Sequence, residues 1–161
     1  MQLQLKLIKE EIGGVLPFDC EIDISELEPR AKAPVGVSGQ VRNRAGVLLL
    51  EMNISGVIDV LCDRCAKKFQ RKVEVFYETA VADHIMGEDS DDILVCEDDL
   101  LDVDELAGQI FILELPSKNL CKEDCKGLCL KCGTDLNIST CNCAQKEIDP
   151  RLMKLRELLD E

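Results

Sequence analysis

The sequence is poor in aromatic and imidazole side chains. Its 161 residues include no tryptophan, a single tyrosine (Tyr77) and a single histidine (His84). A hydrophobic core must therefore rest on leucine, valine and isoleucine, for which an apolar content of 46% is sufficient. We interpret His84, which lies in an acidic stretch, as solvent-exposed. No other histidine is present to activate a serine or cysteine nucleophile.

Other signatures of enzymes and of membrane proteins are also missing. The chain has no Walker loop and no glycine-rich dinucleotide motif, and no pattern places two carboxylates in a cleft. No apolar stretch approaches the roughly 18 residues that span a bilayer, and the polar–apolar alternation after Met1 is unlike a signal peptide. We expect a cytoplasmic, non-enzymatic protein with neither a membrane nor a small-molecule substrate as its partner.

Basic residues are outnumbered, and the acidic excess is concentrated in one segment. Nineteen Lys and Arg face 32 Asp and Glu, a net charge of −13 that opposes long-range attraction to bulk nucleic acid or to an anionic membrane. Residues 83–105 hold eleven acidic residues and no Lys or Arg. Their spacing does not match a calcium-binding EF-hand loop. We interpret residues 83–92 as a solvated loop, and an alternative function is an adaptor that binds a basic protein through residues 83–105.

The first 80 or so residues have the pattern of β-strands. Polar and apolar residues alternate from Leu3 to Leu7, and long β-prone runs extend from Val47 to Val60 and from Phe69 to Val81. The sequence Asn43-Arg-Ala-Gly46 is typical of a turn, and Gly56 is a candidate bulge or bend. The fold class that follows is α+β, with a mainly antiparallel sheet for which a barrel-like closure is one arrangement.

A helix is predicted after the acidic segment, at about 102–115. Asp102 is a good N-cap with Glu105 three residues later, and Pro116 ends the helix. Its apolar stripe is expected to pack on the sheet and comprises Val103, Leu106, Ile110 and Leu113. We therefore divide the chain into a β-rich domain, 1–116, and a cysteine-rich segment, 117–161, which ends in a short helix opened by Asp149 and Pro150.

Ten cysteines remain to be explained. In a reducing cytosol, clustered thiols hold metal or perform redox chemistry more often than they form disulfides. Cys20 and Cys96 stand alone and fit small buried apolar residues. The other eight form close doublets, namely Cys62/Cys65, Cys121/Cys125, Cys129/Cys132 and Cys141/Cys143.

The last two doublets predict a zinc site. Zinc prefers four tetrahedral nitrogen or sulfur ligands, and two doublets supply them with little loss of chain entropy. Cys129 and Cys132 are separated by two residues, and Gly133 permits a turn in which backbone N–H groups point at sulfur. A short loop leads back to Cys141 and Cys143, so these four thiols form our first predicted site.

The first two doublets allow a second site, and alternatives stay open there. If the cysteine-rich segment folds back on the sheet, Cys62 and Cys65 would join Cys121 and Cys125, and the chain would hold one or two zinc ions. A redox pair at Cys62/Cys65 is the alternative, although it would favour a helix N-terminus in a βαβ context. An iron–sulfur cluster also fits four thiolates.

Basic residues gather around the same cysteines. They would converge into one positive face if the two cysteine regions meet, and Phe69 would be available to stack on a base. An ordinary solvated surface is the alternative interpretation. The candidate RNA-binding residues are Arg64, Lys67, Lys68, Arg71, Lys72, Lys126 and Lys131.

Several of these segments together resemble one family. They are C-D-R-C followed by a basic strand, I-L-E-L-P at the helix end, C-K-G-L-C-L-K-C-G-T-D-L-N, C-N-C, and D-P-R-L-x-x-L-R-E-L-L. The chain is similar over nearly its whole length to the YceD family, the large ribosomal RNA subunit accumulation proteins. Leu130 stands where the family segment often has proline.

The resemblance implies a role in the synthesis, processing or accumulation of large-subunit ribosomal RNA, with no established enzymatic reaction. The family's cysteines correspond to the eight in doublets here. The partner implied is ribosomal RNA or a ribosomal protein of the large subunit, contacted by an assembly factor. A thiol or redox protein remains a further alternative.

Overall fold

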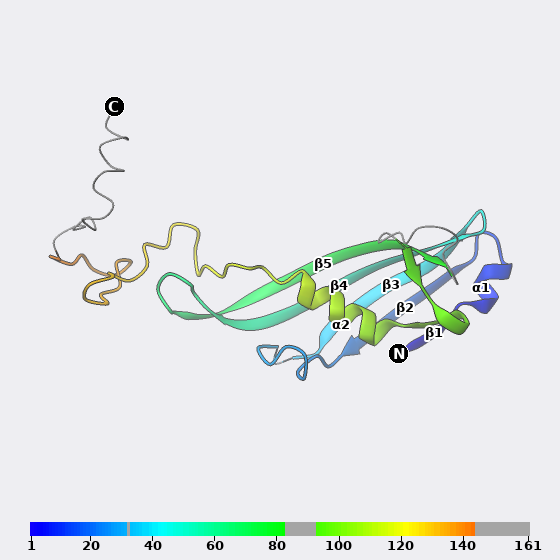
Figure 1. Cartoon of the computed structure of the whole chain (residues 1–161), viewed down its shortest axis with the longest axis horizontal. Coiled ribbons are helices and arrows are strands. Elements are labelled where there is room, and N and C mark those ends of the chain that lie inside the picture. The colour runs from blue at the N-terminus through cyan, green and yellow to red at the C-terminus, as the bar shows by residue number, and fades with distance from the viewer. Residues whose placement is uncertain (32, 83–92, 144–161) are drawn as a thin grey trace, which may run out of the picture.

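The computed structural model describes residues 1–31, 33–82 and 93–143. A five-stranded sheet in the order β2-β3-β4-β5-β6 forms most of the molecule, and β1 and β7 form a separate two-stranded sheet (Figure 1). The elements are β1 (Gln2–Gln4), α1 (Lys6–Glu10), β2 (Val15–Ile22), β3 (Val35–Arg44), β4 (Val47–Leu61), β5 (Lys68–Ala82), β6 (Ile93–Val95), a 3₁₀ turn η1 (Glu97–Asp99), β7 (Leu100–Asp102) and α2 (Val103–Leu113).

The predicted turn at 43–46 joins β3 to β4. Ala45 and Gly46 both have positive φ, as a tight two-residue hairpin connection requires. Asn43 is buried beside it, where its Oδ1 accepts a hydrogen bond from the N–H of Gly46. Its Nδ2 donates to the carbonyls of Ile8 and Lys9, which ties α1 to this end of the sheet.

β4 and β5 form the longest hairpin, with 15 residues in each strand. β3 pairs with β4 only as far as Ser55, so the far part of the hairpin extends past β3 (Figure 1). Pairing of β4 with β5 is continuous through Gly56, so the predicted bulge is absent. A Cβ on Gly56 would lie 2.9 Å from Phe111 Cζ and 2.9 Å from Val35 Cγ2. Glycine therefore makes room for the packed helix.

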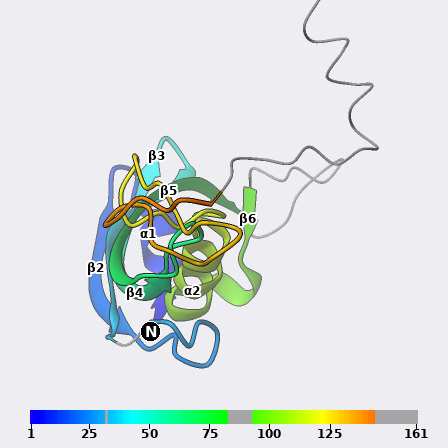
Figure 2. The same cartoon turned by 90° about the vertical axis from the view of Figure 1, so that its left-hand side faces the viewer.

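The sheet curls around α2, and an end-on view shows it as half of a barrel (Figure 2). This confirms the expected α+β class, although β6 pairs with β5 in parallel. Asp102 caps α2 as predicted and accepts from the N–H groups of Asp104 and Glu105. The buried face of α2 differs in part from the predicted stripe because Phe111 is fully buried and Leu113 is 81% exposed.

The N-terminal strand is shorter than the sequence pattern predicts. β1 ends at Gln4 and pairs with β7, and the chain then turns into α1. Leu5 and Ile8 are buried and Leu7 is exposed, which is the three-residue spacing of a helix. The alternation at Leu3, Leu5 and Leu7 overlaps this helical pattern in the sequence. The prediction of strand beyond Gln4 was wrong for this reason.

Part of the predicted organisation lies outside the described residues. This applies to residues 83–92, which are the predicted solvated loop and include His84, and to residues 144–161, which include the predicted C-terminal helix. The described part of the acidic segment, 93–105, forms β6, η1, β7 and the start of α2. Within the described ranges, no helix is long and apolar enough to cross a membrane.

Candidate metal centres

The turn that joins β4 to β5 contains Cys62 and Cys65 in a fixed hydrogen-bond frame. The N–H of Cys62 donates to the carbonyl of Lys67 at 2.9 Å, and the N–H of Ala66 donates to the carbonyl of Cys62 at 2.8 Å. Ala66 has a φ of 57°, in the left-handed region. Such a turn directs both thiols and several backbone N–H groups to one point beyond the end of the hairpin.

The same frame recurs at Cys129 and Cys132. The N–H of Cys129 donates to the carbonyl of Thr134, and the N–H of Gly133 donates to the carbonyl of Cys129, both at 2.8 Å. Gly133 has a φ of 73°, as the sequence predicts. Ala66 occupies the equivalent position in the first turn, so only one of the two turns is marked by glycine in the sequence.

After α2, the chain runs to the tip of the β4–β5 hairpin (Figure 1). Residues 118–128, which contact the hairpin there, are called the returning chain or returning segment below. The N–H of Asp63 donates to the carbonyl of Asn119 at 2.8 Å, and its carboxylate accepts from the N–H of Asn119 at 2.6 Å. Farther on, the N–H of Leu128 donates to the carbonyl of Arg64 at 3.0 Å. A Cβ on Gly127 would lie 2.9 Å from that same carbonyl, so glycine allows the close approach.

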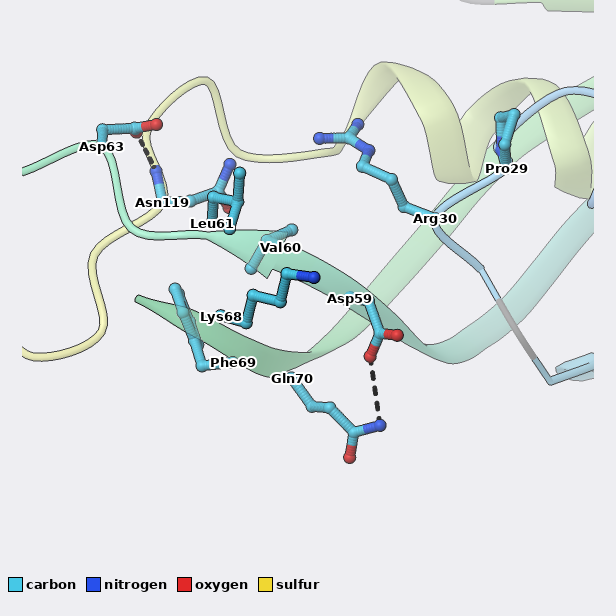
Figure 3. A pocket seen from close by; sticks show the side chains of 10 residues that line it. All are labelled: Pro29, Arg30, Asp59, Val60, Leu61, Asp63, Lys68, Phe69, Gln70 and Asn119. Carbon is cyan, nitrogen blue, oxygen red and sulfur yellow. Dashed lines mark hydrogen bonds between the residues drawn. The ribbon is translucent and has the colours of Figure 1, made fainter. Parts of the chain in front are cut away.

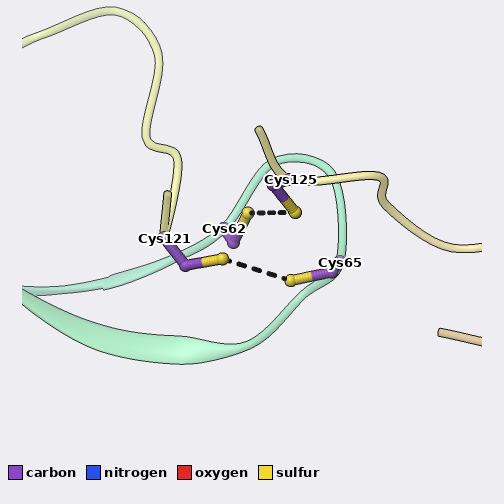
Figure 4. A group of neighbouring side chains, drawn as sticks. All are labelled: Cys62, Cys65, Cys121 and Cys125. Atoms are coloured by element: carbon purple, nitrogen blue, oxygen red, sulfur yellow. Dashed lines mark hydrogen bonds between the residues drawn. The ribbon is translucent and has the colours of Figure 1, made fainter. Parts of the chain in front are cut away.

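This docking brings together the tip cluster, which we define as Cys62, Cys65, Cys121 and Cys125. Its four sulfur atoms lie within 4.8 Å of one another. Cys62 Sγ is 3.8 Å from Cys125 Sγ, and Cys65 Sγ is 3.6 Å from Cys121 Sγ (Figure 4). Four thiolates placed tetrahedrally about 2.3 Å from a zinc ion are about 3.8 Å apart. The observed separations fit a single four-coordinate ion.

The tip cluster is buried in its own small hydrophobic core. Cys62, Cys65 and Cys125 are all buried, and Phe69, Leu120 and Leu128 pack against them. No disulfide joins any of the ten cysteines, all of which lie in the described ranges. Four thiols packed together without a disulfide form a ligand set that could hold a metal ion.

The distal cluster, which we define as Cys129, Cys132, Cys141 and Cys143, lies farther along the chain. Its four sulfur atoms also lie within 4.8 Å of one another. The distal cluster is more open than the tip cluster because Cys132 is exposed. The thiol of Cys132 lies 3.1 Å from the hydroxyl of Thr134. All four ligands come from one short segment, so this cluster forms locally, whereas the tip cluster joins residues 56 positions apart.

Asn137, which lies between Cys132 and Cys141 in the sequence, contacts the tip cluster. Its Nδ2 donates to Cys125 Sγ at 3.4 Å, and its Oδ1 accepts from the N–H of Lys126 at 2.9 Å. Asp135 holds it in place by accepting from both its N–H and its Nδ2, at 2.8 and 2.7 Å. A hydrogen bond to a ligating sulfur orients that ligand and stabilises its charge. The D-L-N sequence was noted in the family pattern, but nothing in its spacing predicted this role.

Backbone donors make one thiol in each cluster acidic. A hydrogen bond from the backbone of Cys121 is the main cause that lowers the pKa of Cys62 to about 6. Backbone groups of Cys132 and Lys131 lower the pKa of Cys129 to about 6. Burial raises the pKa of Cys121 to about 12, and a hydrogen bond with Cys132 raises that of Cys143 to about 12. The hydroxyl of Thr134 also lowers the pKa of Cys132. Each cluster thus combines thiols that ionise readily with thiols whose ionisation is opposed, and a bound cation would neutralise the negative charge.

The candidate basic residues divide into two groups. Arg64 donates to the carbonyl of Cys125 at 2.7 Å, and Arg71 donates to the carbonyl of Lys118 at 3.0 Å. These two guanidinium groups hold the returning chain against the hairpin. The remaining candidates have exposed side chains on the hairpin or near the clusters, and Lys72 pairs with Glu74; they are Lys67, Lys68, Lys72, Lys126 and Lys131.

Comparison with known proteins yields one family. The family model described as large ribosomal RNA subunit accumulation protein YceD matches residues 50–159. YlbN of Bacillus subtilis is 26% identical over 89% of this chain and 88% of its own length. A chloroplastic YCED homolog 1 of Zea mays, named as a large ribosomal RNA subunit accumulation protein, is 26% identical over 79% of this chain and 54% of its own length.

A protein of Mycobacterium tuberculosis is 33% identical over 61% of this chain and 49% of its own length. Its matched part is thus about half of that protein. No solved structure matches the chain. The family match begins in β4 and includes both cysteine clusters, the stretch in which the hairpin and the returning segment meet.

Proposed function

The chain belongs to the YceD family of large ribosomal RNA subunit accumulation proteins, and on that premise we propose that it is a zinc-binding, non-enzymatic factor that contacts ribosomal RNA during large-subunit assembly. Its RNA-contacting part is the basic hairpin tip that the tip cluster holds together. The naming of the maize relative as an accumulation protein supports the process assigned here.

The observation that carries this proposal is the tip cluster itself. Four sulfur atoms within 4.8 Å of one another come from two chain segments, and lysine and arginine residues are neighbours of these cysteines in the sequence. With all four coordination positions supplied by thiolates, a zinc ion there would be structural and would have no open position for a substrate. Its contribution would be to fix the relative positions of the surrounding lysines.

Zinc is favoured over the other metals and over redox chemistry. Tetrahedral four-sulfur sites are typical of zinc or iron, and a multi-iron cluster would keep its four thiolates farther apart, around the outside of the cluster. A catalytic thiol pair would favour an exposed cysteine at a helix N-terminus. Cys62 and Cys65 instead lie in a β-turn and are buried.

RNA contact is supported by the location of the positive charges. Lys67 and Lys68 lie at the hairpin tip, and Lys126 and Lys131 lie on the chain that docks there. The negative total of the chain weakens non-specific attraction to nucleic acid. A local basic surface would then bind RNA by short-range phosphate contacts, which salt screens strongly.

The proposal is tested by RNA binding to a charge-reversed protein. Lys67→Glu with Lys126→Glu changes two exposed tip lysines and leaves the structural guanidinium groups of Arg64 and Arg71 intact. The matched control, Lys6→Glu with Arg44→Glu, makes the same charge change at the opposite end of the sheet (Figure 1).

Filter binding to large-subunit ribosomal RNA at several salt concentrations is the measurement. The tip variant should bind more weakly, with a salt dependence shallower by roughly 0.7 to 0.9 per lost phosphate contact, and the control should match the wild type. Equal weakening in both variants would show that only net charge matters and would reject the tip as the RNA-contacting surface.

A further inference from the structure

A cavity of about 700 Å³ lies beside the hairpin, just before the tip cluster. Three segments line it, namely the end of the β4–β5 hairpin, the loop that contains Pro29 and Arg30, and the returning chain at Asn119 (Figure 3). The volume falls within the range of roughly 300 to 1,000 Å³ typical of ligand pockets. Neither the candidate metal ligands nor Lys67, Lys72, Lys126 and Lys131 contribute to its lining.

The hairpin contributes an apolar surface with one aromatic ring. Val60 and Phe69 face each other across the two strands, and Leu61 and Lys68 form the next pair. Phe69 is half-buried and also packs against the tip cluster, so its ring is held in place. A fixed aromatic ring beside aliphatic side chains is the kind of surface on which a nucleobase stacks, and it accepts any base.

The rim of the cavity combines positive and negative groups. Arg30 is fixed by Glu28, whose carboxylate accepts from its Nε and its Nη2, each at 2.7 Å, so Nη1 is the nitrogen left to face a ligand. Lys68 adds a second cation from the hairpin side (Figure 3). Asp59 and Asp63 bring two carboxylates to the same rim.

This balance discriminates between ligand classes. A compact polyanion such as a free nucleoside triphosphate would meet two carboxylates as well as two cations. A single nucleotide within an RNA strand carries one phosphate on each side, which Arg30 and Lys68 could contact, and its base presents N–H donors that carboxylates accept. The charge pattern and the apolar surface therefore favour an unpaired nucleotide of a continuous strand.

We propose that this cavity binds one unpaired nucleotide of single-stranded RNA, with its base against Phe69 and Val60 and its backbone between Arg30 and Lys68. The assignment rests on the RNA contact proposed above and adds a specific site to it. It also identifies RNA loops and unpaired ends, rather than duplex, as the form recognised.

The cavity depends on the tip cluster for one of its walls. Asn119 reaches the rim because its backbone is bonded to Asp63 in both directions. Two residues later, Cys121 enters the tip cluster. Loss of the tip cluster would release this wall, whereas the distal cluster contributes no lining residue. RNA capture in the cavity should therefore require an intact tip cluster.

The test is photo-crosslinking of the full chain to fragmented large-subunit ribosomal RNA substituted with 4-thiouridine, followed by mass spectrometry of the cross-linked peptides. We expect cross-links on the peptide that spans Lys68 to Gln70. Phe69→Leu should lower affinity by roughly fivefold to a hundredfold, as expected for loss of one stacked base, and Phe69→Tyr should retain it. Metal content that matches the wild type verifies that Phe69→Leu keeps the tip cluster.

Three outcomes would overturn the assignment. RNA that binds normally but cross-links only elsewhere rejects the cavity and leaves the proposed function standing. A wild-type chain that binds no ribosomal RNA rejects both. Unchanged affinity in Phe69→Leu assigns the cavity to another ligand and rejects nucleotide binding.

Discussion

Loss of the tip cluster should undock the returning chain, and the size of the effect follows from loop length. A metal bound to the tip cluster closes a loop between Cys65 and Cys121, which are 56 positions apart. By the chain-entropy account of a cross-link, a loop of that length contributes about 4 kcal/mol. Since each 1.4 kcal/mol is a factor of ten, removal of the cross-link should favour the undocked state by about a thousandfold.

Hydrogen exchange measures this equilibrium residue by residue. The N–H groups of Asp63 and Leu128 donate to Asn119 and Arg64 across the docked surfaces, so they exchange when the segment undocks. In Cys121→Ser with Cys125→Ser, their protection should fall by up to three orders of magnitude. The matched variant, Cys141→Ser with Cys143→Ser, opens only the short distal loop and should keep most of it.

The result that would refute this reasoning is equal protection in the two variants. Unchanged protection after loss of Cys121 and Cys125 would mean that the hydrogen bonds and Arg64 hold the segment without a metal. Equal loss in both variants would mean that the distal cluster is as important for docking as the tip cluster. In either case the long-range cross-link would not be what holds the hairpin tip together.

Three further predictions concern individual side chains. Ala66→Gly should stabilise the protein by about 1 kcal/mol in chemical denaturation, because a left-handed φ is costly for alanine, and a loss of stability would contradict the frame shared with Gly133. Backbone donors, Glu105 first, hold the pKa of Asp102 below its ordinary value of 3.8. Its stabilising effect should therefore be complete above that ordinary pKa and be lost as the pH falls through the lowered pKa of the folded state. The stability difference from Asp102→Asn should shrink as the pH falls in this way, and a constant difference would contradict the assignment. Asn137→Asp should release zinc to a chelator roughly tenfold faster than the wild type. The control Asn142→Asp, which makes the same change of charge at an exposed position nearby, should not release zinc faster. Equal release rates in the two variants would show that Asn137 does not stabilise the tip cluster.

The sequence was informative where a residue type has one strong physical consequence. Asp102 marked the start of α2, and the Asn43-to-Gly46 stretch marked the β3–β4 turn, because capping and positive φ restrict the choice of residue. The cysteine doublets likewise predicted the two groups of four cysteines that the structure brings together. A doublet separation of one to three residues leaves few other ways to place both thiols on one ion.

Features that depend on tertiary packing could not be predicted in this way. Gly56 looked like a bulge because the sequence does not show that Phe111 packs over it. Leu113 continued a helical stripe, but it is exposed at the end of α2. The turn at Cys62 and Cys65 has Ala66 in place of glycine at its left-handed position, so the sequence did not mark that turn. The contacts of Asn119 and Asn137 are long-range or loop-specific, and neither follows any local period.

Elemental analysis of the native protein, purified without chelator and with its thiols reduced, tests the central claim most directly. Two clusters with four sulfur atoms each predict a content close to two zinc ions per chain. Loss of one equivalent is expected in Cys121→Ser with Cys125→Ser. A fully folded chain that contains no metal would contradict the account, because the tip would then be held together by contacts other than a metal cross-link.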